Sequence, residues 1–206
     1  KKKRAEREVK HYKVKRGQSP ARGDAGPGVI IEFSDFECPF CRRFAGHLKR
    51  AQREAGDYPF QYVFKHYTLS TTCNPHVSRD MHPRACFAAS VAICAEAQGK
   101  FWQMHDLLFA NQKALEQEDL IKYAETLELD IVALNACVGS DETANRLQRE
   151  IEEGHKFKVG GTPAFFINGW RFSGAMRSGK INTLVKQYVY GVLPPDEVEA
   201  PKSPPK

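Results

Sequence analysis

The sequence predicts an α/β protein in which a mixed central sheet, flanked by helices, is interrupted by an all-helical insertion. Three observations lead to this prediction. Residues 29–70 have the pattern strand, helix, strand; residues 84–157 carry only helical patterns; and residues 162–191 return to a hairpin and a closing helix. A strand–helix–strand unit implies parallel strands and a right-handed crossover, and a hairpin adds antiparallel ones.

Composition and charge limit the function classes. The length of 206 residues suits one domain with an insertion or two small domains, and the hydrophobic fraction of 41% suits a globular protein with a core. No apolar run approaches the roughly 20 residues that span a bilayer. Residues 1–16 hold nine Lys or Arg and two Glu, so a net charge of +6 leaves about −1 for the rest. The basicity belongs to an arm of unknown role, and we expect no nucleic-acid partner.

The amino-terminal part should contain little regular structure before the first buried strand. KKKRAERE has no apolar segment after it, so no signal peptide is expected in this chain. HYKVK (11–15) predicts a short edge strand, and the Gly- and Pro-rich stretch 17–28 predicts a loop. VIIEF (29–33) is β-branched and aromatic and predicts a buried strand, as does PFQYVFKHYTLS (59–70).

A helix should lie between these two strands. Pro39 suits the first helical position, where a missing N–H costs nothing. Phe40, Phe44 and Leu48 recur at helical spacing, and Gly56 ends the pattern.

The helical insertion should contain four helices. The Ala-rich stretch 84–98 ends at a glycine, 100–112 has one broad apolar face, 116–128 is amphipathic, and 141–157 begins with Asp141 as its expected N-cap.

The last part of the chain should return to the sheet. Strands at 162–168 and 170–174 flank Asn168-Gly169, a strong hairpin signal, and 178–191 predicts the closing helix. The chain should divide into a basic arm, edge strand and loop (1–28), a βαβ half (29–70), the helical insertion (71–157), a second half with hairpin and helix (158–191), and a disordered Pro-rich tail (192–206).

Cys38 and Cys41 carry the chemistry. A cysteine at a helix start lies beside unpaired N–H groups and the positive end of the dipole, which favour the thiolate that attacks disulfides. Two intervening residues let Cys41, the less exposed thiol, close a small disulfide ring. The same spacing is half of a zinc site, but no second short-spaced pair lies nearby, so the redox interpretation is favoured.

Two charged residues lie within the predicted strands. Glu32 precedes Cys38 by six positions, and Lys65 lies in the second strand. A buried acid and a lysine under the site would exchange the proton of Cys41 as it ionises. The alternative is that each points to solvent at a strand end.

Three stretches together identify a family. FSDFECPFC, AEAQGKFWQMHDLLFANQ and VGGTPAFFING, in this order, resemble a DsbA-like thiol–disulfide oxidoreductase of the thioredoxin superfamily over about residues 11–191. The resemblance implies a thioredoxin fold, with Cys38 as exposed nucleophile and Cys41 as resolving thiol. It also implies a cis Pro163 that faces Cys38 and, with Thr162, binds the substrate backbone. Glu32 and Lys65 match the family's buried acid and its partner lysine.

The sequence departs from the strongest oxidases of this family at two places. Those oxidases have a histidine between the cysteines, where this chain has Pro39 and Phe40, and they often have Val where it has Thr162. A less stabilised thiolate makes a weaker oxidant, so the direction of electron flow stays open.

Four further cysteines allow three connectivities. Similar proteins often carry a disulfide equivalent to Cys94–Cys137, which would leave Cys73 to pair with Cys86. A zinc site at Cys73, His76, His82 and Cys86 has suitable spacing and is the alternative; otherwise no metal is expected.

The expected function is oxidation of cysteines in exported protein substrates, without a cofactor. The resemblance implies a quinone-linked membrane partner, and cysteine usage favours an extracytoplasmic location, in the periplasm or cell envelope. The alternatives are a reductase or isomerase, a non-enzymatic peptide-binding module, and a glutathione-dependent transferase.

Overall fold

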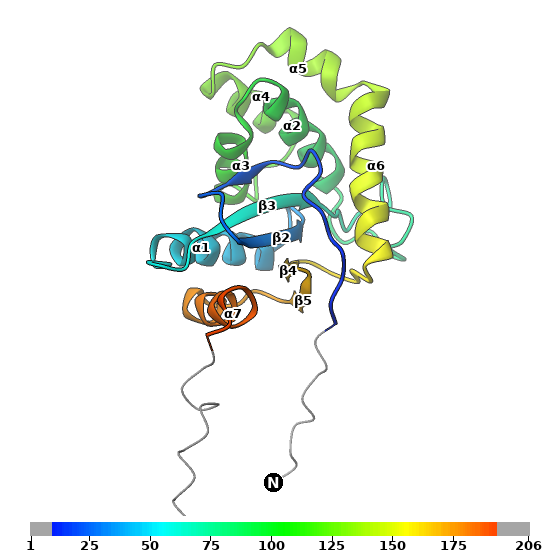
Figure 1. The fold of residues 1–206 in the computed structure, drawn as a ribbon. Coiled ribbons are helices and arrows are strands. Elements are labelled where there is room, and N and C mark those ends of the chain that lie inside the picture. The colour runs from blue at the N-terminus through cyan, green and yellow to red at the C-terminus, as the bar shows by residue number, and fades with distance from the viewer. Residues whose placement is uncertain (1–9, 193–206) are drawn as a thin grey trace, which may run out of the picture.

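A mixed sheet flanked by helices runs through the molecule, as expected (Figure 1). It has five strands in the order β1-β3-β2-β4-β5. The computed structural model describes residues 10–192; the start of the basic arm (1–9) and the expected disordered tail from residue 193 lie outside it. The strands are β1 (Ala21–Arg22), β2 (Gly28–Ser34), β3 (Phe60–His66), β4 (Ala164–Ile167) and β5 (Trp170–Ser173).

The central unit is the predicted βαβ crossover. β2 and β3 are parallel, in a register that runs from Gly28↔Phe60 to Ser34↔His66, and α1 (Pro39–Arg53) joins them. Pro39 takes the first position of α1, as its fixed φ and missing N–H allow.

The second half of the sheet is antiparallel. β4 pairs with β2, and β5 pairs with β4 through the predicted hairpin. Asn168 and Gly169 both have positive φ (44° and 88°), which suits the twist of a two-residue hairpin turn. α7 (Ser178–Tyr190) closes the chain against α1.

The helical insertion has one helix more than expected. Its helices are α2 (Ala85–Ala97), α3 (Phe101–Ala110), α4 (Gln117–Thr126), α5 (Ile131–Val138) and α6 (Asp141–Lys156). α5 was missed because eight residues are too few to show a period; Asp130 caps it by accepting from Ala133 N at 3.0 Å. The expected cap of α6 was also wrong by one residue, because the Ser140 hydroxyl accepts from Thr143 N at 3.2 Å.

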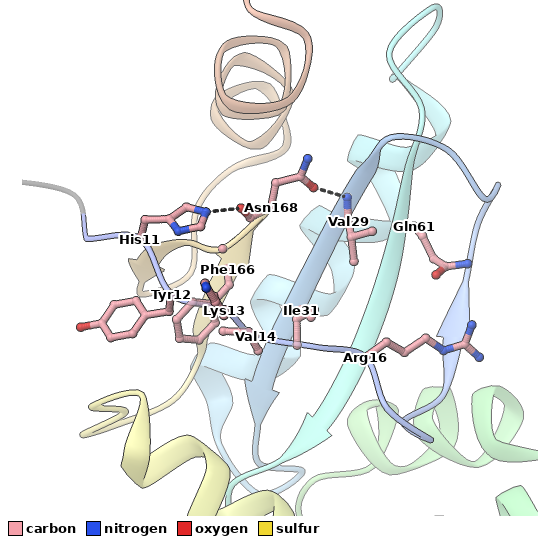
Figure 2. A pocket seen from close by; sticks show the side chains of 11 residues that line it. His11, Tyr12, Lys13, Val14, Arg16, Val29, Ile31, Gln61, Phe166 and Asn168 are labelled. Atoms are coloured by element: carbon pink, nitrogen blue, oxygen red, sulfur yellow. Dashed lines mark hydrogen bonds between the residues drawn. The ribbon is translucent and has the colours of Figure 1, made fainter.

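The expected edge strand at 11–15 is wrong. The segment makes one isolated bridge, His11↔Trp170, and then crosses over the strands (Figure 2). Tyr12 and Val14 alternate as in a strand, but they pack flat on the sheet. The true edge strand is β1, inside the predicted loop, and it pairs antiparallel with β3.

Alternation along the strands divides the core in two. The α1 face carries Ile30, Glu32, Tyr62, Phe64 and Phe165, which lie with the buried residues of α1 and α7. The α6 face carries Ile31, Phe33, Val63, Lys65 and Phe166, which lie against α6 and the crossing segment.

α6 packs very closely on its face of the sheet. A Cβ added at Gly154 would lie 2.5 Å from a ring carbon of Tyr67 and 3.0 Å from one of Phe33. Glycine is therefore required there despite its low helix propensity. Within residues 10–192, no helix combines the length and apolar character needed to cross a membrane.

Candidate active site

Cys38 begins α1. It is the N-cap residue, with extended φ and ψ of −74° and 119°, and its sulfur lies 3.5 Å from the carbonyl oxygen of Thr162. The Gln112 side chain, which follows α3, holds this turn by donating to the carbonyls of Phe36 (2.6 Å) and Cys38 (2.9 Å). The insertion therefore helps to fix the start of α1.

The expectation of an exposed Cys38 needs correction. Cys38 is only 3% exposed, because the Thr162 segment lies over it, and Cys41 is fully buried. The order of exposure is still the expected one. Within the Cys38–Cys41 motif, the exposed residues are Pro39 and Phe40, and Phe40 is 53% exposed.

The two thiols differ strongly in acidity. The pKa of Cys38 is lowered from 9.0 to about 6, first by its hydrogen bond with the Cys41 thiol and also by the backbone N–H groups of Cys41 and Phe40, while burial opposes this shift. Burial raises the pKa of Cys41 well above its usual value, and the charges of Glu32 and Cys38 add to this. Such a pair has one thiolate and one protonated thiol at neutral pH.

Thr162 and Pro163 lie opposite the pair, directly before β4. The peptide bond between them is cis, and the carbonyl of Pro163 accepts from Gly174 N at 2.9 Å, beyond the end of β5. The Thr162 hydroxyl is buried and finds no hydrogen-bond partner among residues 10–192. The structure thus brings four of the expected site residues together, on two separate segments.

Glu32 lies beneath the pair on the α1 face. It is fully buried; one carboxyl oxygen accepts from the Tyr62 hydroxyl at 2.6 Å, and the other has no partner within the described residues. Burial raises the pKa of Glu32 from 4.5 to about 7, although Tyr62 and the Arg22 charge oppose this shift. A carboxyl with this pKa can hold or release a proton near pH 7.

Lys65 does not join the site, contrary to expectation. The register pairs Phe64 with Glu32 and Lys65 with Phe33, so Lys65 projects from the α6 face. There its ammonium donates to Glu153 (2.8 Å) and to the Ser19 hydroxyl (3.1 Å). A side chain on the opposite face of a sheet cannot reach Glu32.

Tyr62 and Arg22 are neighbours of Glu32 that were not among the expected site residues. Tyr62 shares a face with Phe64, and Arg22 on β1 lies with its guanidinium 5.2 Å from the centre of the Tyr62 ring. Strict alternation in FQYVFKH could have indicated Tyr62. Arg22 lay in a predicted loop and gave no such indication.

The other four cysteines form two disulfides. Cys73 is bonded to Cys86, with Cα atoms 6.0 Å apart, and Cys94 to Cys137, at 5.8 Å. The alternative zinc site is therefore wrong, because both of its cysteines are bonded to each other. No cluster of three possible metal ligands occurs within residues 10–192.

A cavity of about 380 Å³ lies elsewhere, on the α6 face of the sheet. Figure 2 shows the crossing segment passing over the sheet at Ile31 and Phe166, and Val29 also lines the cavity. Asn168 fixes one side by accepting from Val29 N at 2.8 Å. None of the residues lining this cavity belongs to the cysteine site.

A thioredoxin-type sheet with a dithiol at the first crossover helix defines the class of protein. The sequence matches the thioredoxin family over residues 15–187, and the chain belongs to that family. A solved thioredoxin-like oxidoreductase from Silicibacter pomeroyi has the same fold (TM-score 0.71, 20% identity, 84% of this chain and 92% of that one). So does α-DsbA2 from Wolbachia pipientis, described as a thiol–disulfide exchange protein (TM-score 0.70, 16% identity, 84% and 88%).

Curated relatives have a different name. Na⁺/H⁺ antiporter NhaA 3 of Salinispora tropica is 39% identical over 150 residues, which are 72% of this chain and 21% of that protein. NhaA of Herminiimonas arsenicoxydans is 31% identical over 158 residues, or 77% and 23%. The chain therefore spans about a fifth of the length of the relatives that it matches.

Proposed function

We propose that this chain is a protein thiol–disulfide oxidoreductase that transfers its Cys38–Cys41 disulfide to cysteines of exported proteins. One observation carries the proposal: an acidic thiol at a helix N-terminus lies beside a buried partner thiol and under a backbone carbonyl. Thiol–disulfide exchange needs this pair and no cofactor or metal.

Oxidation of a substrate proceeds in two exchanges. A substrate thiolate attacks the Cys38 sulfur, the Cys38–Cys41 bond breaks, and Cys41 leaves with the electron pair. Glu32 protonates the departing Cys41 sulfur, because its pKa of about 7 keeps a proton available. A second substrate thiolate then attacks the substrate sulfur of the mixed disulfide and releases Cys38 as a thiolate. The substrate has lost two electrons and the enzyme dithiol has gained them.

The low pKa of Cys38 supports the oxidising direction. A thiolate with a pKa of about 6 is a good leaving group, and its stability favours the reduced enzyme over the disulfide. A reductase or isomerase is the second candidate, favoured by Phe40 and Thr162, neither of which is typical of the strongest oxidases. The equilibrium constant of Cys38–Cys41 with glutathione separates the two.

Substrate binding and reoxidation extend the proposal. The Thr162–Pro163 segment would hold an extended substrate backbone across Cys38, and a quinone-linked membrane protein would accept the electrons. The two disulfides elsewhere in the fold fit an extracytoplasmic compartment, such as the periplasm. The antiporter names refer to far longer proteins, and transport is not part of the proposal.

Trapping tests the proposal directly. A Cys41→Ala variant should accumulate mixed disulfides through Cys38 when mixed with oxidised cysteine peptides, because the resolving thiol is missing. Mass spectrometry of the adducts gives the result, and Cys38→Ala/Cys41→Ala is the matched control. A Cys41→Ala protein that forms no adduct would contradict the redox function and leave the peptide-binding module as the better account.

A further inference from the structure

The loop closed by the Cys73–Cys86 disulfide lies against the segment that leads into Cys38. Arg84 N donates to a Glu37 carboxyl oxygen at 2.8 Å, and the Arg84 guanidinium lies 3.2 Å from the other oxygen. Two residues earlier, the His82 ring nitrogen Nδ1 lies 2.9 Å from the Asp35 carboxylate. The disulfide loop and the β2–α1 turn are therefore joined at two successive points.

Asp35 is tied to the cysteine motif through the backbone. Cys38 N donates to the carbonyl oxygen of Asp35 at 3.1 Å. The Asp35 carboxylate is buried and accepts from Glu37 N and Leu69 N, each at 2.7 Å, besides the His82 ring. Three donors fix this negative charge close to Cys38, where it disfavours a second negative charge.

We infer that His82 is a positioning residue that, in its protonated form, neutralises Asp35 and so stabilises the Cys38 thiolate from outside the Cys38–Cys41 motif. The inference rests on the proposed redox function of Cys38. The spacing of His82 in the sequence had suggested only a metal ligand.

The groups around the His82 ring favour its protonated form. The pKa of His82 is raised, first by its hydrogen bond to Asp35 and then by the charges of Asp35, Cys38 and Glu37. The charged or titratable side chains near the ring are Asp35, Glu37 and Cys38 before α1, Arg84 beside the ring, and Glu116 before α4, which pairs with Arg84. The carboxylates outnumber Arg84, so a protonated imidazole is favoured.

The backbone fixes the ring in place. His82 N donates to Leu69 O at 3.2 Å, and Ala85 N donates to His82 O at 3.1 Å at the start of α2. The His82 side chain is only 17% exposed, so solvent screens its charge weakly.

Thiolate titration in ultraviolet absorbance tests the inference. His82→Gln keeps an N–H that can donate to Asp35 but removes the charge, and it should lower the acid dissociation constant of Cys38 roughly three- to tenfold. His82→Lys, which keeps a positive charge, should restore the acid dissociation constant of Cys38. His76→Gln is the control, because His76 lies in the same disulfide loop but forms its hydrogen bond with Glu152 (2.8 Å). An unchanged Cys38 titration in His82→Gln would overturn the inference.

A measurement on the unmodified protein avoids any folding defect of the variants. Because coupling between two sites is reciprocal, the Cys38 thiolate must also favour protonated His82. The NMR titration of the His82 ring should therefore move to lower pH when Cys38–Cys41 is oxidised. Equal titrations in both redox states would refute the coupling. Cysteine trapping with Cys41→Ala does not depend on His82, so failure of the redox function is detected separately.

Discussion

Glu32 and Lys65 lie on neighbouring strands, one residue apart in register, and both are buried, yet their surroundings are opposite. On the α6 face, Lys65 meets Glu153 at 2.8 Å and the Ser19 hydroxyl at 3.1 Å. On the α1 face, Glu32 meets only the Tyr62 hydroxyl, and its second oxygen has no partner within residues 10–192.

The difference means that Lys65 stabilises the fold, whereas Glu32 can take part in proton transfer. A buried cation with an ion-pair partner keeps its charge, whereas a buried acid without one is protonated more easily. Glu32 accordingly has a pKa of about 7, beneath a thiol that must gain and lose a proton.

The largest difference between substitutions on the two faces of the sheet should be in a reaction rate. Glu32→Gln removes the proton acceptor for Cys41, so Cys41 should resolve a Cys38–peptide mixed disulfide roughly a hundredfold more slowly at pH 7. Lys65→Met is the control and should react at the rate of the unchanged protein. Rapid quenching and chromatography give both rates, and equal slowing in the two variants would remove the distinction between the faces.

The pH dependence of stability comes next. The pKa of Glu32 rises from 4.5 unfolded to about 7 folded, so the folded state holds the proton more tightly. Its contribution to the free energy of unfolding is complete below pH 4.5 and is lost as the pH rises through 7, by up to about 3 kcal/mol. Urea unfolding of the reduced proteins from pH 4 to pH 8 should show this loss, and Glu32→Gln should lack it. If the free energies of unfolding of the unchanged protein and of Glu32→Gln change with pH in parallel, the loss of stability does not come from Glu32.

Lys65→Met should cost stability without changing the redox site. The substitution leaves Glu153 and Ser19 without their shared donor, and we expect the free energy of unfolding to fall by about 2 kcal/mol, because Glu153 is partly exposed and can bind water. Urea unfolding at pH 7 measures the loss. The Cys38 thiolate titration should stay unchanged; a shift would mean that Lys65 acts across the sheet after all.

Tyr62→Phe should have the smallest effect of the four. It removes the hydroxyl that donates to Glu32 at 2.6 Å, so the pKa of Glu32 should rise further and stability at pH 7 should fall by about 1 kcal/mol. Carbon-13 NMR of the glutamate carboxyl follows the titration. A pKa of Glu32 that stays the same or falls would show that Tyr62 does not hold the carboxylate.

Local patterns predicted most of the fold. The strand, helix and strand around Cys38 and the Asn168-Gly169 hairpin depend on neighbouring residues, and the structure confirms them. The segment 11–15 failed because alternating Tyr12 and Val14 fit the surface of a sheet as well as a place within it. The short helix α5 was missed because eight residues show no clear period.

The site was harder to predict where it depends on distant segments. Cys38, Cys41 and Glu32 follow from one continuous stretch, but the side of the sheet that Lys65 occupies depends on strand register. The position of His82 beside Asp35 depends on how a loop 47 residues further along the chain folds back. Sequence spacing alone suggested a metal ligand there, because spacing does not show which groups meet.

Gly154 has a consequence for engineering this protein. Helix propensity would favour alanine at an internal position of α6 by about 1 kcal/mol, and a stabilising library built on propensity would include that change. Here the added methyl group would overlap the ring of Tyr67, and α6 would have to move outward from the strands. Since the residues that follow α6 lead to Thr162, such a library would shift the loop beside Cys38 through a residue that touches neither cysteine of that motif.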